Sequence, residues 1–502
     1  MSALAIHPAE APEETHAPAP LIDASPETLA AWSAWTQPIE GARPLGVLRP
    51  RSRDEAMRCL EACAKAGVAL YPVSRGRGWG LGSRRPVVAS MMLDLSGLDR
   101  ILDIDLKTGT ARIEPGVTFT QLQTALKAKG LAFHVPMFGG PADASVLANA
   151  LERGDGCGAA GDRYAQLDDV EIGLATGERF HTGPSRFGPD FASPHARPAG
   201  PLLQGLFSQS GFGVALSGRI GLAHTAYHTQ IVQAELGVST NIGPALAALR
   251  GLVRSEVVAP YAISVWDAAK RATVLEGAEA LWSADRRDLR QASWCASVLV
   301  ASDHDDLLHA KTAVVIGALA SVARDVQTIS DRDADGRRVE TPLTGFNEGR
   351  NVTTCYAARN VPPELRRTPD ADRCGFVWHC TALPFQGEAL ADLVRIVSEA
   401  AAPEDGIVPA LGIQAISASA LQAYVSLAWD RDAQGADASA RTVHDAIQDG
   451  LAKAGYLPFR LAHASLAKAP RAQDDWASVV ARLRDALDPN GILASGRVPD
   501  LG

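Results

Sequence analysis

The pattern of hydrophobic and polar positions predicts alternating short helices and strands in the first half of the chain. Ser52 and Glu55 have the spacing of a capping box, and they precede apolar residues at helical intervals. Gly67 predicts the end of that helix. The apolar run 68–73 follows directly and has the length and composition of a buried strand. A helix therefore leads into a strand just before a glycine-rich stretch.

The same pattern continues through the rest of this half. Residues 87–95 predict another strand, and the segments 101–114 and 170–181 each predict a hairpin with a polar turn. Thr118 is placed to cap a helix that ends at Gly130. Helices mixed with short strands in this way indicate an α+β fold class.

The pattern changes from about residue 236 to residue 455, where Ala- and Arg-rich helical segments surround strands such as 296–301 and 422–429. A final helix is predicted at 475–487. The first 28 residues hold five prolines among Ala and Glu, a composition that buries too little apolar surface to fold. We expect four parts: a disordered lead-in at 1–28, a first domain at 29–235, a second domain at 236–455 and a C-terminal segment at 456–502.

Composition narrows the class of protein. A chain of 502 residues with 46% hydrophobic content can bury more than one core. The net charge of −9 argues against nucleic acid and favours a small-molecule partner. Seven scattered cysteines without a Cys-x-x-Cys motif predict reduced thiols and a cytoplasmic location. No apolar run is long enough to span a membrane, and the acidic N-terminal stretch does not read as a signal peptide.

The glycine-rich stretch 74–82 has a glycine at every second position from Gly76 to Gly82. Such spacing lets backbone amides converge on an anion, with phosphate or pyrophosphate as the natural ligand. Leu81 stands where a dinucleotide fingerprint starting at Gly76 needs its third glycine, and no Gly-Lys-Ser/Thr follows. From this stretch alone, anion binding and a ligand-free turn are equally good interpretations.

The stretch is the first of several motifs in a fixed order. These motifs are Pro72-Val73-Ser74, Glu114-Pro115-Gly116-Val117-Thr118, Gly139-Gly140, Leu151-Glu152-Arg153-Gly154 with Gly161-Asp162, Gly205-Leu206-Phe207-Ser208-Gln209-Ser210 and Asp488-Pro489-Asn490-Gly491-Ile492-Leu493. Their order and spacing resemble the vanillyl-alcohol oxidase and p-cresol methylhydroxylase family of FAD-linked oxidoreductases, over about residues 45–225 and 450–500.

The resemblance implies a two-domain α+β FAD-binding fold of the p-cresol methylhydroxylase type, with an α/β cap domain that forms the substrate pocket. Residues 29–235 and 456–502 then form the FAD-binding domain, and 236–455 form the cap. The residues implied to contact FAD are Ser74, Arg75, Gly76, Arg77, Gly78, Trp79, Pro115, Gly139, Gly140, Gly154 and Asn490.

The resemblance also implies that a hydride passes from a substrate carbon to flavin N5. Asp162 matches the family's active-site carboxylate, and its other interpretation is a loop Asp that caps a turn. Arg460 matches the arginine that compensates negative charge on the substrate or the reduced flavin; the alternative is an exposed surface arginine.

Departures from the family concern the substrate and the cofactor linkage. Phe119 and Phe459 stand where its phenol oxidases have tyrosines, which disfavours a simple 4-hydroxybenzyl substrate. Only Tyr424 lies near the position of covalent attachment, so we expect dissociable FAD. His379 and His463 are candidate pocket residues, although lone histidines more often pack structurally. No metal-binding spacing occurs.

We therefore expect an FAD-dependent oxidase that acts on an alcohol, amine or benzylic-type carbon of a small organic substrate and uses O2 as acceptor. One alternative is a dehydrogenase that passes electrons to a separate carrier. The chain has no haem-attachment motif, so a cytochrome that served as carrier would be a separate chain. Another is a flavin-binding protein that has lost catalysis. A homo-oligomer, in the simplest case a homodimer, is expected.

Overall fold

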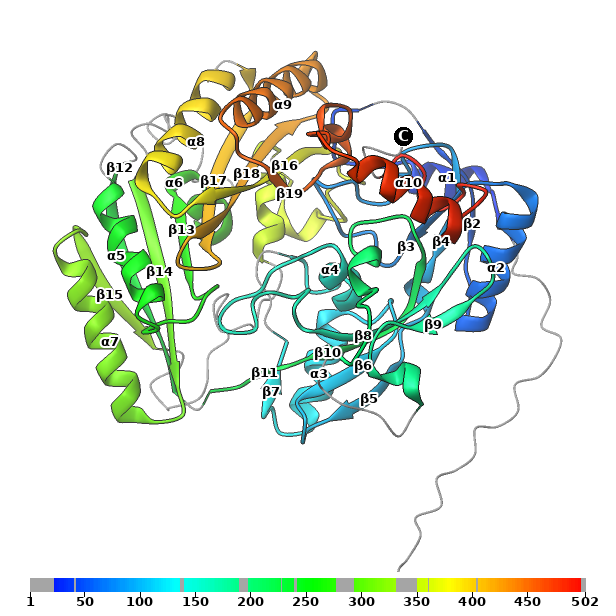
Figure 1. Cartoon of the computed structure of the whole chain (residues 1–502). Helices are drawn as coiled ribbons and strands as arrows, with labels where there is room; N and C mark the ends of the chain where they lie inside the picture. Colours follow the sequence, from blue (N-terminus) through cyan, green and yellow to red (C-terminus); the bar gives the residue numbers. More distant parts are fainter. Residues whose placement is uncertain are drawn as a thin grey trace, which may run out of the picture.

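The computed structural model describes residues 22–39, 42–135, 140–188, 197–226, 228–238, 242–276, 293–330, 350–359, 361–402 and 405–497. Within these ranges the chain forms two parts that lie side by side, one with two smaller sheets and one with a single large sheet (Figure 1). The α+β class predicted from the sequence is confirmed.

The first part contains a four-stranded sheet. Its strands, in spatial order, are β1 (Ile22–Asp23), β2 (Pro44–Leu48), β4 (Ser90–Asp94) and β3 (Leu70–Val73). The last three are parallel, as the helix-then-strand pattern requires. Helix α2 (Arg53–Ala66) begins where the Ser52 hydroxyl accepts the Glu55 amide and ends at Gly67, whose φ is 64°. The Glu55 carboxylate accepts the Arg51 amide rather than that of Ser52.

A five-stranded antiparallel sheet completes the first part. Its strands, in spatial order, are β5 (Ile101–Asp105), β6 (Thr110–Ile113), β10 (Val214–Gly221), β8 (Leu167–Gly173) and β9 (Arg179–His181). Helices α3 (Phe119–Ala128) and α4 (Val146–Leu151) bury Leu122 and Leu147 in its core. Strands β7 (Phe133–His134) and β11 (Ala223–His224) pair separately. The two predicted hairpins are present.

The second part is built on an eight-stranded antiparallel sheet. Its strands, in spatial order, are β15 (Asp325–Ser330), β12 (His228–Val238), β14 (Ser293–Ser302), β13 (Ile263–Asp267), β17 (Val408–Ala415), β18 (Ala420–Asp430), β16 (Cys374–Pro384) and β19 (Pro458–Arg460). Its outer face is covered by α5 (Gly243–Arg254), α7 (Asp305–Ala320), α8 (Gly387–Ala400) and α9 (Ala436–Lys453) (Figure 1). Shorter helical segments cover part of the opposite face, and the rest of that face is left to form a site.

The described part of the chain has further helical elements outside the sheets and their covering helices. They are α1 (Pro26–Trp32), α6 (Ala268–Arg271), α10 (Trp476–Leu487), a π turn at Ala272–Glu276 and short 3-10 helices at Leu95–Gly97, Pro184–Phe187, Gln204–Phe207, Arg350–Tyr356, Pro363–Leu365 and His463–Lys468. Near the C-terminus the chain returns to the parallel sheet, where Leu70 bonds to Ile492 and Ala494 through the backbone.

Two boundaries differ from those expected. The lead-in predicted at 1–28 is too long, because Ile22–Asp23 pairs with β2 and Ser25 caps α1. Trp32 anchors this segment by packing with Val47 and Met92. The eight-stranded sheet begins before residue 236 and ends after residue 455, so its outer strands extend past the predicted domain limits. Residues 1–21 lie outside the described part of the chain.

The buried groups and the helices add two observations. All seven cysteines are unpaired and buried. No helix in the described part of the chain is both long enough and apolar enough to cross a membrane.

Candidate active site

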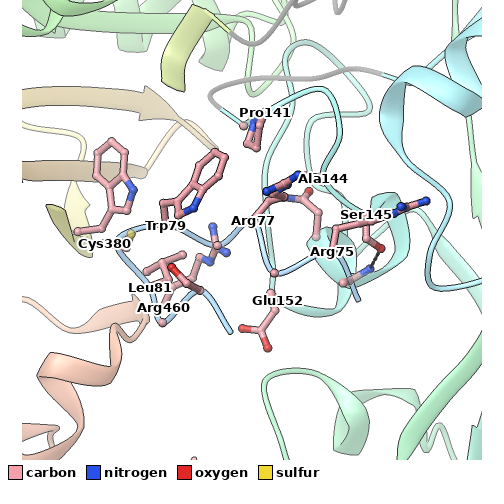
Figure 2. A pocket seen from close by; sticks show the side chains of 18 of the residues that line it. Arg75, Arg77, Trp79, Leu81, Pro141, Ala144, Ser145, Glu152, Cys380 and Arg460 are labelled. Atoms are coloured by element: carbon pink, nitrogen blue, oxygen red, sulfur yellow. Dashed lines mark hydrogen bonds between the residues drawn. The ribbon is translucent and has the colours of Figure 1, made fainter. Parts of the chain in front are cut away.

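A cavity of about 320 Å³ lies between the two parts of the molecule. Its lining comes from β3 and the glycine-rich stretch, from residues 140–149 at the start of α4, from the inner face of the eight-stranded sheet, and from α6 and the 3-10 helix that pack on that face. Figure 2 shows Arg75, Ala144 and Ser145 on one side of this cavity, with Cys380 and Arg460 on the other. Its size lies in the range of small-molecule sites.

The glycine-rich stretch presents its backbone to the cavity. Gly76 and Gly80 have φ of 62° and 77°, a conformation that glycine adopts without strain. The Gly80 amide donates to the Thr36 hydroxyl at 3.0 Å, and its carbonyl accepts the Trp378 amide at 3.0 Å. Among the described residues, the amides from Arg75 to Trp79 find no acceptor. This row of amides is therefore available to an anion.

Two arginines stand in the cavity wall at the stretch, and the wall beside them is open. Arg75 and Arg77 line it; the Arg75 Nε donates to the Gly116 carbonyl at 2.6 Å, and Arg77 pairs with Asp143 at 2.6 Å. A Cβ built on Gly78 or Gly140 would meet no atom within 4 Å. Free amides, two guanidinium groups and glycines that keep the wall open fit the pyrophosphate of FAD.

One row of residues crosses the sheet beneath the cavity. Trp266, Gly412, Tyr424, Cys380 and Arg460 stand directly opposite one another on five neighbouring strands, β13, β17, β18, β16 and β19. Directly opposed residues of a sheet share one face, and all five line the cavity. The sheet thus brings residues far apart in the sequence to one surface.

Asp155 meets this row from the first part of the molecule. The Tyr424 hydroxyl donates to the Asp155 carboxylate at 2.7 Å. Burial raises the pKa of Asp155, while the Tyr424 hydroxyl and the charge of Arg460 act in the opposite direction. Burial, with Asp155 beside it, raises the pKa of Tyr424 well above its usual value. The result is a carboxylate that can exchange a proton within the cavity.

Glycines hold Asp155 in place. Gly154 lies so close to α4 that a Cβ there would meet the Asn149 side chain at 2.2 Å. The Gly156 carbonyl accepts the Gln414 amide group from β17 at 2.9 Å. The turn after α4 is therefore bonded to the eight-stranded sheet, here called the cap sheet, and Asp155 lies between the two glycines of this turn.

The structure brings most of the predicted site residues to the cavity. Those that line it are Ser74, Arg75, Gly76, Arg77, Gly78, Trp79, Phe119, Gly140, Tyr424, Arg460 and His463. The Phe119 ring lies 4.8 Å from the buried Arg163 guanidinium. The Phe459 ring contacts Tyr424 edge-on, with 5.7 Å between the ring centres, but Phe459 does not line the cavity.

Four predicted cofactor contacts are not supported in the same way. Pro115, Gly154 and Asn490 do not line the cavity. The Pro115 carbonyl instead accepts the Ser145 hydroxyl, and the Asn490 side chain donates to the Ala64 carbonyl. Gly139 lies outside the described residues.

Asp162 does not line the cavity either. Its carboxylate accepts the Ala165 amide at 3.0 Å, which is the turn-capping arrangement that the sequence left open. Its backbone pairs with that of Asp155, whose side chain does reach the cavity. The catalytic role of Asp162 stays a prediction, and Asp155 is the carboxylate that sequence reasoning missed. The acid between two glycines after a helix was the available signal.

His379, predicted as a pocket residue, does not line the cavity. Successive residues of a strand point to opposite faces, so Cys380 faces the cavity while His379 points away from it. Its ring stacks on His444 with 4.5 Å between centres, and burial lowers its pKa well below the usual value. His463 does line the cavity, where its Nε2 lies 3.1 Å from the Tyr71 hydroxyl.

Sequence reasoning also missed Lys270, a buried lysine in the cavity wall. Burial lowers its pKa to about 8. It lies in an alanine-rich segment, Asp267-Ala268-Ala269-Lys270, without any motif around it. No signal in the sequence separates it from a surface lysine.

The cavity combines a row of backbone amides suited to a pyrophosphate with a carboxylate, Asp155, and a cation, Arg460, on the eight-stranded sheet. This combination is the arrangement expected of a flavin-dependent oxidoreductase. The family model of an FAD binding domain matches residues 44–183. The 1'-carboxy-chondrochloren decarboxylase of Chondromyces crocatus is 32% identical to this chain and is aligned over 90% of both. The chain belongs to the vanillyl-alcohol oxidase and p-cresol methylhydroxylase family of FAD-linked oxidoreductases, and its cofactor is FAD.

Solved structures agree on the fold. p-Cresol methylhydroxylase with substrate bound superposes with a TM-score of 0.82 at 17% identity, covering 95% of this chain and 93% of that one. The 4-ethylphenol oxidase of Gulosibacter chungangensis, in complex with isoeugenol, gives the same TM-score at 18% identity and the same coverage. Over a shorter region, the flavoprotein subunit of 4-cresol dehydrogenase from Pseudomonas putida is 26% identical, across 38% of this chain and 37% of its own.

Proposed function

We propose that this enzyme oxidises an alcohol, amine or benzylic-type carbon of a small organic substrate, with O2 as the final acceptor. Bound FAD supplies the hydride acceptor for this chemistry. The observation that supports the proposal most strongly is the meeting of Asp155, Tyr424 and Arg460 in the cavity that the glycine-rich stretch also lines.

Asp155 accepts the proton that leaves the substrate. Its raised pKa brings the carboxylate closer to the range in which a general base works well, and the bond from Tyr424 orients it. The Tyr424 hydroxyl donates to one oxygen of this carboxylate at 2.7 Å, and the carboxylate lines the cavity in which the substrate would bind. The chain thus holds the base and sets its direction.

Arg460 compensates negative charge. It stands beside Cys380 at the edge of the sheet, and its buried Nε has no partner in the described part of the chain. A preorganised guanidinium stabilises charge that develops on a substrate oxygen or on the cofactor during reaction. Removing the guanidinium should slow the oxidation step more than it weakens substrate binding.

The wall of the pocket favours an apolar substrate body. Leu81 and Phe119 line the cavity, and neither offers a hydrogen bond. A phenol oxygen placed beside these two residues would lack a partner, at a cost of about 1–3 kcal/mol per missing bond. We propose a substrate with an apolar or conjugated body.

FAD is proposed to bind without a covalent link. Tyr424 is the residue nearest to the expected attachment position, and its hydroxyl donates to Asp155. A pKa raised well above the usual value disfavours the phenolate that such attachment needs. Acid precipitation tests this proposal, because dissociable flavin stays in the supernatant.

A dehydrogenase that uses a separate electron carrier is the alternative within the same chemistry. Anaerobic reduction by substrate, followed by mixing with air, separates the two. Rapid reoxidation supports the oxidase, and slow reoxidation that is accelerated by an artificial electron acceptor supports the dehydrogenase.

Removal of a carboxyl group is a second candidate function. It is favoured by the relative from Chondromyces crocatus, which is named a decarboxylase and is aligned over 90% of both chains. Candidate acids labelled with 13C at the carboxyl group test it, because release of labelled CO2 during flavin reduction distinguishes decarboxylation from simple oxidation.

The main test is anaerobic titration of the purified yellow protein with candidate alcohols, amines and benzylic compounds. Bleaching of the visible flavin absorbance by at least one class supports the proposal. Protein that holds FAD, is reduced by dithionite and is bleached by none of them contradicts it.

A further inference from the structure

Lys270 is a buried cation in the wall of the cavity, on the cap side. It belongs to α6, which starts where the Asp267 carboxylate accepts the Lys270 amide at 2.7 Å. Only 7% of the residue is exposed, and it lines the same cavity as Tyr424 and Arg460. The proposed oxidation assigns it no role.

The ammonium group has few partners for a buried charge. Its Nζ donates to the Thr354 hydroxyl at 3.3 Å and lies 4.7 Å from the centre of the Trp378 ring. Within the described residues no carboxylate pairs with it; Asp267 influences it through space but caps the helix. An ammonium has three donors, and a buried charge without a counter-ion is costly. The environment therefore favours an added anion.

The sheet places Lys270 near the reaction centre. Gly412 stands directly between Trp266 and Tyr424 in the row across the sheet. A Cβ on Gly412 would lie 3.1 Å from the Trp266 ring and 4.0 Å from the Lys270 Cγ. The missing side chain leaves room for the lysine stem beside the row.

The surroundings distinguish the kind of anion. Arg75 and Arg77 offer two charges for phosphates at the glycine-rich stretch, whereas the Lys270 ammonium in the cavity wall compensates a single negative charge. The indole rings of Trp266 and Trp378 line the cavity beside Lys270, which suits a flat apolar body. These features together match an aromatic or conjugated carboxylic acid.

We propose that Lys270 binds a carboxylate of the substrate, whose conjugated body packs against Trp266 and Trp378 and directs the oxidisable carbon toward Asp155. Thr354, which is buried and does not line the cavity, holds the Lys270 ammonium in position. The assignment rests on the proposed function for its reaction, but the binding of the carboxylate does not require turnover. Lys270 is thus a specificity-determining residue for conjugated acids.

Calorimetric titration of the FAD-loaded protein with trans-cinnamate and with cinnamamide tests this assignment. The two probes share a shape and differ in charge. We expect the wild type to bind the acid at least about tenfold more tightly than the amide, since a hydrogen bond to a charged partner is involved. Lys270→Met should abolish that preference and leave the affinity for the amide within about twofold, because the side-chain volume is kept.

Three further variants make the result specific. Lys270→Arg keeps the charge and should retain the preference. Lys453→Met removes an exposed lysine at the end of α9 and should behave like the wild type. Thr354→Val should weaken the binding of the acid alone, by about threefold, because the hydroxyl that accepts the Lys270 ammonium is lost and the ammonium is held less firmly. If Lys270→Met fails to fold, which its flavin content and visible spectrum would show, Thr354→Val provides the test instead.

The assignment is overturned if Lys270→Met retains the preference for the acid, if the wild type binds the amide as tightly as the acid, or if it binds neither probe. Failure of the proposed oxidation looks different. In that case the charge preference is present and depends on Lys270, but no candidate substrate bleaches the flavin.

Discussion

The glycine-rich stretch and the row across the cap sheet face the same cavity, but they are built in different ways. The stretch is one continuous segment between Ser74 and Gly82, and its backbone amides are the groups proposed to bind FAD. The row takes one side chain from each of several strands between β13 and β19. Cofactor binding therefore depends on local backbone conformation, whereas the chemistry depends on tertiary assembly.

The comparison predicts that changes to the two regions separate flavin binding from catalysis. A change in or beside the row across the cap sheet should leave FAD bound but lower the rate of substrate oxidation. A change in the glycine-rich stretch should release the flavin. Four predictions follow this division, from the largest expected effect to the smallest.

Asp155→Asn should reduce the rate of flavin reduction by about 10²- to 10⁴-fold while FAD remains bound, because the general base is lost. Anaerobic stopped-flow spectroscopy measures this rate of flavin reduction by the substrate. The matched control is Asp162→Asn, which removes a turn cap outside the cavity and should cost about 1 kcal/mol of stability with a far smaller kinetic effect. The reverse order of effects would restore Asp162 as the base.

Gly80→Ala should weaken FAD binding by about tenfold or more, as strain at positive φ is added to a steric conflict. A Cβ at this position would meet the Trp378 ring at 2.6 Å. Fluorescence titration of the apoprotein with FAD gives the affinity. Gly67→Ala has a similar φ of 64° and no neighbour within 4 Å, so it should lower stability without affecting FAD. Equal FAD affinities in the two variants would contradict the assigned role of the stretch.

Tyr424→Phe should slow oxidation several-fold and move its pH dependence. The rate rises with pH as Asp155 loses its proton, and the raised pKa of Asp155 places that rise above the usual carboxyl range. The Tyr424 hydroxyl favours the charged carboxylate, so its removal raises the pKa of Asp155 further and shifts the rise to higher pH. A profile of kcat/KM against pH that shifts to lower pH, or not at all, would exclude this pairing.

Thr36→Val should have the smallest effect, a two- to fivefold loss of FAD affinity for one lost hydrogen bond of about 1 kcal/mol. The Thr36 hydroxyl accepts the Gly80 amide and so supports the stretch from outside it. Thr442→Val, on the exposed side of α9, is the control. FAD affinities measured side by side decide the point, and an unchanged value for Thr36→Val would remove Thr36 from the support of the loop.

The predictable part of the fold is the part where neighbouring residues determine conformation. The Ser52 cap, the Gly67 stop and the Thr118 capping box all stand where the sequence indicated. Strand ends were less predictable, as with β3, which begins at Leu70 rather than Val68. Pairing partners rather than propensity decide where a strand starts.

The site divides in the same way. The FAD-binding stretch, Tyr424 and Arg460 were identified from ordered motifs, and they line the cavity. Asp155 and Lys270 were missed, and His379 was expected in the cavity but does not line it. The position of each side chain depends on which face of its strand, turn or helix lines the cavity. A shift by one residue reverses that face, and a family motif matched at low identity does not specify it.

The amino-acid sequence by itself determined the α+β class, the glycine-rich stretch and the need for FAD, since these depend on short-range backbone preferences and on motif order. Only the tertiary structure decided that Asp155 meets Tyr424, that Gly412 leaves room for Lys270, and that His379 points away. The physical reason is that these contacts join segments far apart in the chain through strand register and sheet twist. Charges that look ordinary in the sequence become reactive only when burial removes them from water.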